Sequence, residues 1–173
     1  LPSGFTRRAV FGARPSRDRI AEAVEILGLK DADIVVNIQG DQPLFEPSQV
    51  DEVVGPLRDD ATIPMSTLIY RIVRDEEITH PNAVKTVFDK KNFALYFSRA
   101  TIPFVRDRDT RADYYKHHGI YAYRRDFLRT FTSLSEGILE RLEALEQLRE
   151  ERLHVAAPAA PAPSRRRAPA RHP

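Results

Sequence analysis

The stretch IVVNIQGDQP, residues 34–43, indicates the fold class of this chain. Its first part, 34–38, is a short β-branched run without alternating polarity, which is typical of a strand covered on both faces in a parallel sheet. The QGDQP that follows is a turn signal. We therefore expect 34–38 to be a central strand of an α/β domain, with a ligand-binding turn at its carboxyl end.

Helices are expected on either side of this strand. Apolar residues at helical spacing precede Gly28, where a helix would stop, and Pro47 can open a second helix. Residues 136–149 form a third, amphipathic segment. The leucines expected to be buried in it are Leu139, Leu142, Leu145 and Leu148, and the stripe of the second helix is Val50, Val53, Val54 and Leu57. Strands are expected at 65–73, 83–88, 93–98 and 118–123, and the turn DKKN, residues 89–92, is expected to join the second and third of them as a hairpin.

The distribution of charge divides the chain into three parts. Residues 1–19 contain five arginines and one aspartate, and the Ala/Pro/Arg-rich 156–173 contain four arginines and no acidic residue. Between them, 20–155 hold 18 basic and 24 acidic residues. We expect 20–155 to be the α/β domain and 156–173 to be disordered, because the tail lacks large apolar residues. A basic tail that binds nucleic acid or anionic lipid is the alternative, which the acidic central part disfavours.

Composition excludes several functional classes. The 173 residues are 42% hydrophobic and 30% charged, which is typical of a globular domain. The absence of cysteine excludes disulfides, thiolate metal sites and cysteine nucleophiles. No apolar run approaches the ~20 residues of a membrane span, and no secretory signal is visible. The GxGxxG, GxxxxGK[ST], HExxH and GxSxG motifs are also absent.

Asp41 is the first candidate for chemistry, because it closely follows the predicted strand. Gly40 before it permits a sharp turn or the close approach of a ligand, and Pro43 fixes the exit of the chain. A carboxylate in this position is suited to Mg²⁺, which prefers oxygen ligands and often shares them with substrate phosphates. The alternative is an aspartate in an ordinary turn.

Other polar residues could bind a substrate. Arg99 follows a predicted strand, where its guanidinium can bind a carboxylate or phosphate or lie exposed. His117 and His118 point to opposite faces of a strand, so at most one is expected to contact a ligand. Tyr121 can offer its hydroxyl to a polar substrate or pack in the core. By composition alone, a solvated face of 136–149 is formed by Glu140, Glu143, Glu146 and Gln147.

Five blocks of the sequence, in order, resemble the 3-deoxy-manno-octulosonate cytidylyltransferase (CMP-Kdo synthetase) family. They are IVVNIQGDQPLFEP, HPNAVKTVFD, ALYFSRATIPFVRD, YKHHGIYAYRRDFL and LERLEALEQLR. The resemblance implies a nucleotidyltransferase with a parallel-rich, Rossmann-like sheet, flanking helices and a small β-arm that helps to form a homodimer. It also implies a cytoplasmic enzyme that transfers a cytidylyl group from CTP to Kdo, giving CMP-Kdo and pyrophosphate for lipopolysaccharide synthesis, with Mg²⁺ as cofactor.

The same resemblance assigns roles to residues of this chain. It implies that Asp41 is a catalytic, Mg²⁺-binding aspartate and that Arg99 is a catalytic residue facing the sugar carboxylate. It implies further substrate-binding residues in the QGD, HxGIY and LEQLR motifs, which are Gln39, Gly40, His117, Tyr121, Glu146 and Gln147.

Two motifs of the family have no counterpart in this sequence. One is the N-terminal RLPGKPL loop that holds the CTP phosphates, and the other is the C-terminal GVDTPEDL motif with a second metal ligand. On this resemblance we expect a fragment with little or no activity by itself. The alternatives are an inactive remnant of such an enzyme, or a CMP-activating enzyme for a related acid sugar, such as an amino variant of Kdo or a sialic acid.

Overall fold

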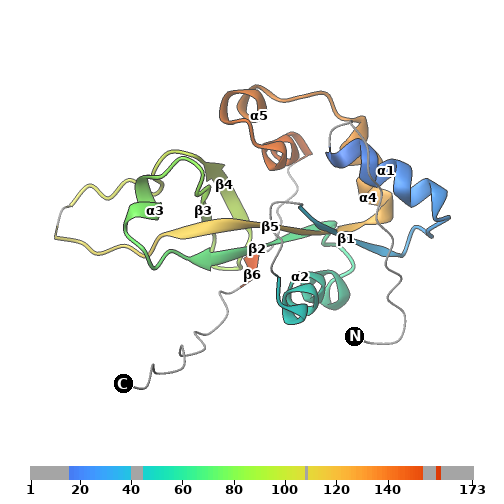
Figure 1. Ribbon diagram of the computed structural model, residues 1–173, viewed down its shortest axis with the longest axis horizontal. Coiled ribbons are helices and arrows are strands. Elements are labelled where there is room, and N and C mark those ends of the chain that lie inside the picture. The colour runs from blue at the N-terminus through green and yellow to red at the C-terminus, as the bar shows by residue number, and fades with distance from the viewer. Residues whose placement is uncertain (1–15, 40–44, 108, 154–158, 161–173) are drawn as a thin grey trace, which may run out of the picture.

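A mostly antiparallel sheet lies at the centre of the protein, with helices on both of its faces (Figure 1). The computed structural model describes residues 16–39, 45–107, 109–153 and 159–160. The strands are β1 (Ile34–Ile38), β2 (Met65–Arg71), β3 (Lys85–Phe88), β4 (Ala94–Ser98), β5 (Tyr115–Arg124) and β6 (Ala159–Ala160). The helices are α1 (Ser16–Ile26), α2 (Pro47–Asp59), α3 (Glu76–Thr79), α4 (Arg125–Ser133), α5 (Ile138–Glu143) and the 3₁₀ helix η1 (Glu146–Leu153). The expected α/β class with flanking helices is confirmed.

The ten-residue strand β5 organises the sheet because it pairs with three other strands. It pairs antiparallel with β1, β2 and β3, and β4 extends the sheet from β3, again antiparallel. Among the described residues only β6 pairs in parallel, beside β2. The expectation of a parallel-rich sheet is therefore wrong for this part of the chain. The central position expected for 34–38 is also wrong, because β1 pairs with β5 alone among the described strands.

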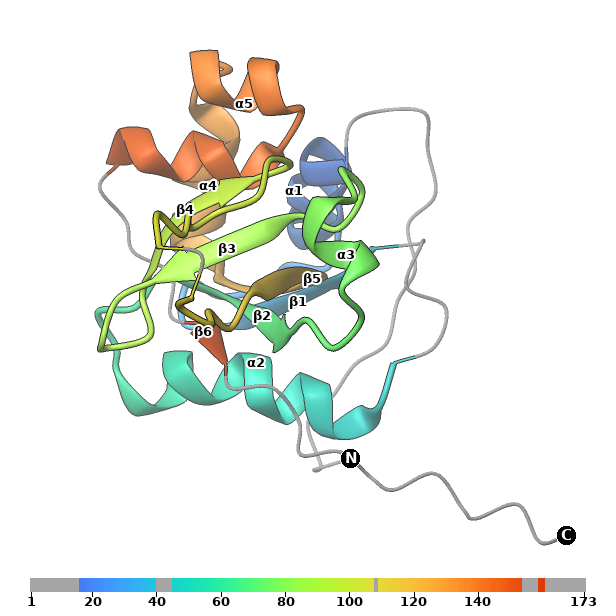
Figure 2. The same ribbon diagram turned by 90° about the vertical axis from the view of Figure 1, so that its left-hand side faces the viewer.

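The apolar run of β1 reflects helices on both faces of the sheet, and it carries no information on strand direction. Ile34, Val36 and Ile38 pack against the core cluster beneath α2. Val35 packs against a second cluster, which α1 and α4 cover. Figure 2 shows these layers, with α2 on one side of the sheet and α1, α4 and α5 on the other. A strand covered on both faces has this pattern whether its neighbours are parallel or antiparallel.

Helix α2 confirms the prediction made from its apolar stripe. Pro47 occupies the first turn, and the amide of Glu46 donates to the side chain of Gln49 at 2.8 Å, which satisfies the helix start. The four residues of the predicted stripe are all buried: Val50, Val53, Val54 and Leu57.

The expected helix over 136–149 is wrong in its length and in half of its buried face. The chain turns at Ala144, whose φ of 51° is left-handed, and this turn separates α5 from η1. Leu145 and Leu148 are buried against Phe97, as expected, but Leu142 is 75% exposed. Leu139 is also on the surface, at 39% exposure. A left-handed residue rotates the following turn out of register, so a periodicity of three residues does not define one face.

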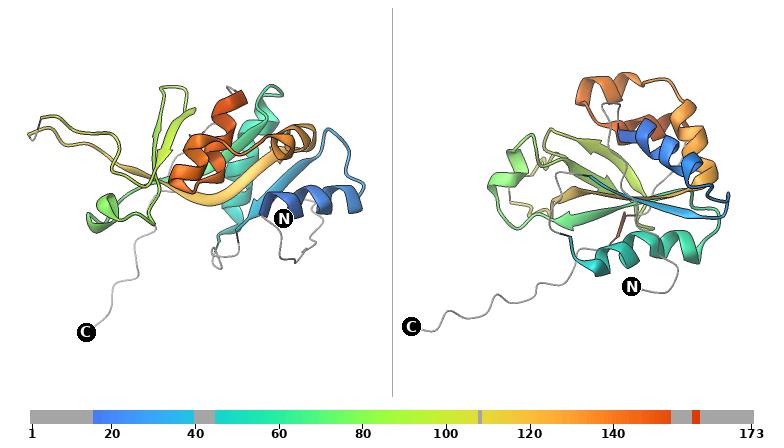
Figure 3. Two further views of the ribbon diagram at one scale, coloured as in Figure 1. Left: turned by 90° about the horizontal axis from the view of Figure 1, so that it is seen from above. Right: turned by 45° about the vertical axis from the view of Figure 1, so that its right-hand side comes forward.

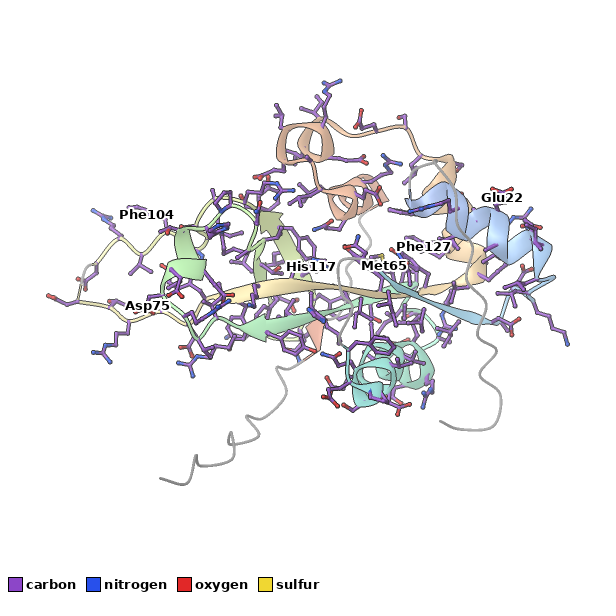
Figure 4. All side chains as sticks on the ribbon, viewed as in Figure 1. Glu22, Met65, Asp75, Phe104, His117 and Phe127 are labelled. Carbon is purple, nitrogen blue, oxygen red and sulfur yellow. The ribbon has the colours of Figure 1, made fainter. Side chains whose placement is uncertain are left out.

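Strands β3 and β4 form the predicted hairpin, and with α3 they lie at the end of the protein away from α1 and α4 (Figure 3). Phe104, labelled in Figure 4, follows β4 at this end and is 87% exposed. In the tail expected to be disordered, Ala159 and Ala160 instead pair with Thr67 and Leu68 of β2, while 156–158 and 161–173 lie outside the described residues. The described helices include none that is long and apolar enough to cross a bilayer.

Candidate functional site

Polar side chains from three strands share one face of the sheet. Asn37 of β1 and Thr67 of β2 are both register partners of Tyr121 on β5. Residues paired directly across strands point to the same side, so these three side chains share a face. It is the face that α4 covers, since Tyr121 belongs to the core cluster with Met65 and Phe127. Figure 4 labels Met65 and Phe127.

His117 is held in this group in a neutral form. Thr67 Oγ1 lies 2.8 Å from His117 Nε2 and 2.9 Å from the carbonyl oxygen of Ile120. The single hydroxyl proton goes to that carbonyl, so Nε2–H of His117 donates to Thr67 and Nδ1 is left as an acceptor. Burial, with a smaller contribution from His118, lowers the pKa of His117 to about 3. The imidazole is therefore uncharged at neutral pH.

Tyr121 and Gln147 meet across this face, although they come from motifs 26 residues apart. The Tyr121 hydroxyl donates to Oε1 of Gln147 at 3.4 Å, and both side chains are buried. The rings of His117 and Tyr121 are also in contact, with centroids 5.1 Å apart. The structure thus brings together three of the predicted site residues. Glu146, which the resemblance also named, is exposed.

Gln39 lies at the edge of the same group, because its amide donates to the carbonyl of Gly119 at 3.1 Å and continues the pairing of β1 with β5. Gly40 and Asp41, the other residues of the QGD motif, lie outside the described residues. The described residues contain no group of three or more His, Asp or Glu side chains that could hold a metal ion. Magnesium binding at Asp41 therefore stays a prediction.

Arg99 belongs to a second group, at the junction of α5 and η1. Its guanidinium donates to the carbonyls of Glu143 at 2.7 Å, Pro81 at 3.0 Å and Ala144 at 3.2 Å. A guanidinium has five N–H donors, so two remain beyond these three bonds. The predicted bond from Arg99 to a substrate carboxylate stays a prediction, and it would use those two donors.

Two charged residues support Arg99: Glu143, which the sequence placed on a solvated face, and Lys85, which it did not single out. The Glu143 carboxylate accepts from the Ser98 hydroxyl at 2.6 Å and from the Arg99 amide at 2.9 Å. Lys85 is fully buried and donates to the carbonyls of His80 at 2.9 Å and Arg99 at 2.6 Å. Burial lowers the pKa of Lys85, an effect that the Glu143 charge opposes. A lysine inside the apolar run AVKTVF was the signal that could have identified it.

Glu140 is a further correction to the acidic face expected for 136–149. Its carboxylate accepts from Nε of Arg149 at 2.7 Å, from Nη2 of the same residue, and from the amide of Gly137 at 3.1 Å. Both charged side chains are buried, with 5% of Glu140 and 3% of Arg149 exposed. The ion pair links α5, which contains Glu140, to η1, which contains Arg149 and Gln147.

Comparison with known proteins identifies the family. A family model described as cytidylyltransferase matches residues 13–157. The chain belongs to the cytidylyltransferase family. It is 72% identical over 148 residues to a 3-deoxy-manno-octulosonate cytidylyltransferase of Syntrophus aciditrophicus, a match that covers 84% of this chain and 60% of that relative. It is 56% identical to an enzyme of the same name from Desulfosudis oleivorans, over 79% of this chain and 55% of that relative.

Other cytidylyltransferases extend this comparison. An 8-amino-3,8-dideoxy-manno-octulosonate cytidylyltransferase of Shewanella baltica is 49% identical over 84% of this chain and 61% of its own length. A solved structure of CMP:2-keto-3-deoxy-manno-octonic acid synthetase complexed with CTP matches with a TM-score of 0.79 and 37% identity, over 88% of this chain and 61% of that one. The chain therefore spans about three-fifths of the length of the relatives it matches.

Proposed function

We propose that this chain is part of an enzyme that transfers a cytidylyl group from CTP to Kdo. In this reaction the anomeric hydroxyl oxygen of Kdo forms a bond to the α-phosphorus of CTP. The bond from that phosphorus to the oxygen bridging it to the β-phosphorus breaks, pyrophosphate leaves, and the hydroxyl proton is released. The names of the Syntrophus and Desulfosudis relatives and the CTP complex of the structural neighbour support this proposal.

The observation that carries the proposal is the convergence of Tyr121, Gln147 and neutral His117 on one face. A sugar with several hydroxyls is bound best by uncharged groups that both donate and accept hydrogen bonds. A phenol, a carboxamide and an imidazole whose Nδ1 is an acceptor supply such groups. Arg99, with two donors beyond its carbonyl bonds, adds a cation for the carboxylate of an acid sugar.

The same proposal includes Mg²⁺ as cofactor. It also includes a homodimer in the cytoplasm that makes CMP-Kdo for lipopolysaccharide synthesis. The resemblance of the QGD motif supports Asp41 as a metal ligand, and Mg²⁺ would neutralise charge that develops on the transferred phosphoryl group.

The exposed apolar Leu95 and Phe104, at the end of the sheet formed by β3 and β4, support a contact between two copies. Light scattering of the purified protein would measure the mass of the assembly.

The experiment that tests the function compares two proteins. One is this chain alone. The other, here called the completed enzyme, is this chain joined to the segments of the Syntrophus relative that lie outside the match. Pyrophosphate release from CTP and Kdo is measured with and without Mg²⁺. We expect Mg²⁺-dependent activity in the completed enzyme, little in the chain alone, and loss of most activity in the Asp41→Asn variant. An inactive completed enzyme would contradict the proposal.

A second candidate substrate is the 8-amino analogue of Kdo, which the names of the Shewanella relatives favour. The two sugars differ at one carbon, so the completed enzyme should be assayed with each at equal concentration. We expect a higher kcat/KM for Kdo, because the relatives named for Kdo are more similar to this chain. A preference for the amino sugar would assign the chain to the second activity.

A further inference from the structure

Gly119 lies between two predicted site residues on the polar face of the sheet. β1 and β5 pair in the register Ile38↔Ile120, and the next bond along is the one from the Gln39 amide to the Gly119 carbonyl. Gln39 and Gly119 are thus opposite each other, and their Cα substituents point to the same side. Since alternate residues of a strand share a face, that side also carries His117 and Tyr121.

A bulge in β5 draws this part of the face together. Thr67 pairs with Tyr121, but its neighbour Leu68 pairs with His118, so Gly119 and Ile120 have no register partner on β2. Four residues of a regular strand would span about 13 Å. The rings of His117 and Tyr121 nevertheless have centroids 5.1 Å apart. Bulges of this kind often redirect side chains beside active sites.

The space above Gly119 is occupied by the carboxamide of Gln39. A Cβ atom added to Gly119 would lie 2.5 Å from Oε1 of Gln39 and 3.2 Å from its Cδ. To reach an ordinary contact of 3.4 Å, the amide oxygen would have to retreat by about 1 Å. The φ of Gly119 lies outside the left-handed region, so the backbone itself does not require glycine. Space for the Gln39 side chain is the remaining reason for a glycine here.

We propose that Gly119 is a positioning residue, whose lack of a side chain holds the Gln39 carboxamide on the face that carries His117 and Tyr121. The proposal rests on the proposed function, in which that face binds the substrates. It joins the QGD motif to the HxGIY motif through one contact. A displacement of about 1 Å at a substrate-binding group can lower the rate about 100-fold, so the identity of residue 119 would affect catalysis through Gln39.

The position of the carboxamide can be tested in this chain without any activity. The side-chain NH₂ signals of Gln39, assigned by their loss in Gln39→Ala, are followed in ¹⁵N-labelled protein. We expect Gly119→Ala to shift them. The matched control is Gly55→Ala in α2, where no described atom lies within 4 Å of the added Cβ, and which should leave them in place. Unshifted Gln39 signals in Gly119→Ala would overturn the proposal.

The role in catalysis is tested by the kinetic coupling of the two residues in the completed enzyme. We expect Gly119→Ala to lower kcat/KM about tenfold or more when Gln39 is present, and less than about twofold in the Gln39→Ala background. A residue that only supports the fold would cause equal losses in both backgrounds, and that result would overturn the proposal. If the parent enzyme is inactive, the proposed function fails, whereas the NMR measurement still decides where the carboxamide lies.

Discussion

Replacing Arg149 with methionine should destabilise the protein strongly, because it removes the guanidinium that pairs with the buried Glu140 carboxylate. Glu140 is 5% exposed and accepts two bonds from the Arg149 guanidinium. The same carboxylate also accepts from the Gly137 amide at 3.1 Å, a bond that the substitution leaves in place. Breaking a buried ion pair on one side costs about 3–5 kcal/mol. That is a large part of the 5–15 kcal/mol that typically stabilises a domain.

Urea unfolding followed by circular dichroism measures this loss, and thermal unfolding should show a fall in Tm of about 6–20 °C. The matched control is Arg58→Met, which removes an exposed pair with Asp51 at 3.3 Å and should cost less than about 1 kcal/mol. The double variant Glu140→Met with Arg149→Met should return to within about 1 kcal/mol of the parent, since it removes both charges. Equal losses in Arg149→Met and Arg58→Met, or additive losses in the double variant, would refute the reasoning.

Three further changes test the site. The pKa of His117 is about 3 in the folded protein and about 6.5 when unfolded, so the unfolded chain gains the proton first as pH falls. About 2 kcal/mol of stability should therefore be lost by pH 5. His117→Phe should flatten this part of the profile of stability against pH, and parallel profiles for the parent and the variant would contradict the assignment. Lys85→Met should cost about 1–3 kcal/mol in urea unfolding, since it removes the donor of two part-buried hydrogen bonds to the carbonyls of His80 and Arg99. In the completed enzyme, Arg99→Ala should raise KM for Kdo about tenfold or more and KM for CTP far less, because a charged hydrogen bond to the sugar carboxylate is lost; equal effects on both substrates would show a different role.

Local patterns were sufficient for most of the helices and strands. The stripe of α2 and the proline at its start predicted a helix whose four valine and leucine residues are all buried. The turn at 89–92 predicted the hairpin of β3 and β4, in which Asn92 has a left-handed φ of 64°. These features depend on residues within a few positions of one another, so sequence alone contains the information that specifies them.

Sequence motifs also named the residues of the candidate site, but they did not predict how these residues are arranged. Gln39, His117, Tyr121 and Gln147 were all named from the resemblance, and the structure places them on or beside one face. It is the bulge in β5 that brings the rings of His117 and Tyr121 into contact. A bulge depends on the mismatch between two paired strands, which no single stretch of sequence displays.

Only the tertiary structure decided which of the repeated leucines are buried and which charges lie inside. The left-handed turn at Ala144 puts Leu142 on the surface, while Glu140 is buried because Arg149, nine residues later, neutralises it. The apolar run 34–38 likewise did not predict that β1 pairs with β5. Burial and pairing depend on segments far apart in the chain, and a local pattern of polarity shows only that a segment is covered, without showing what covers it.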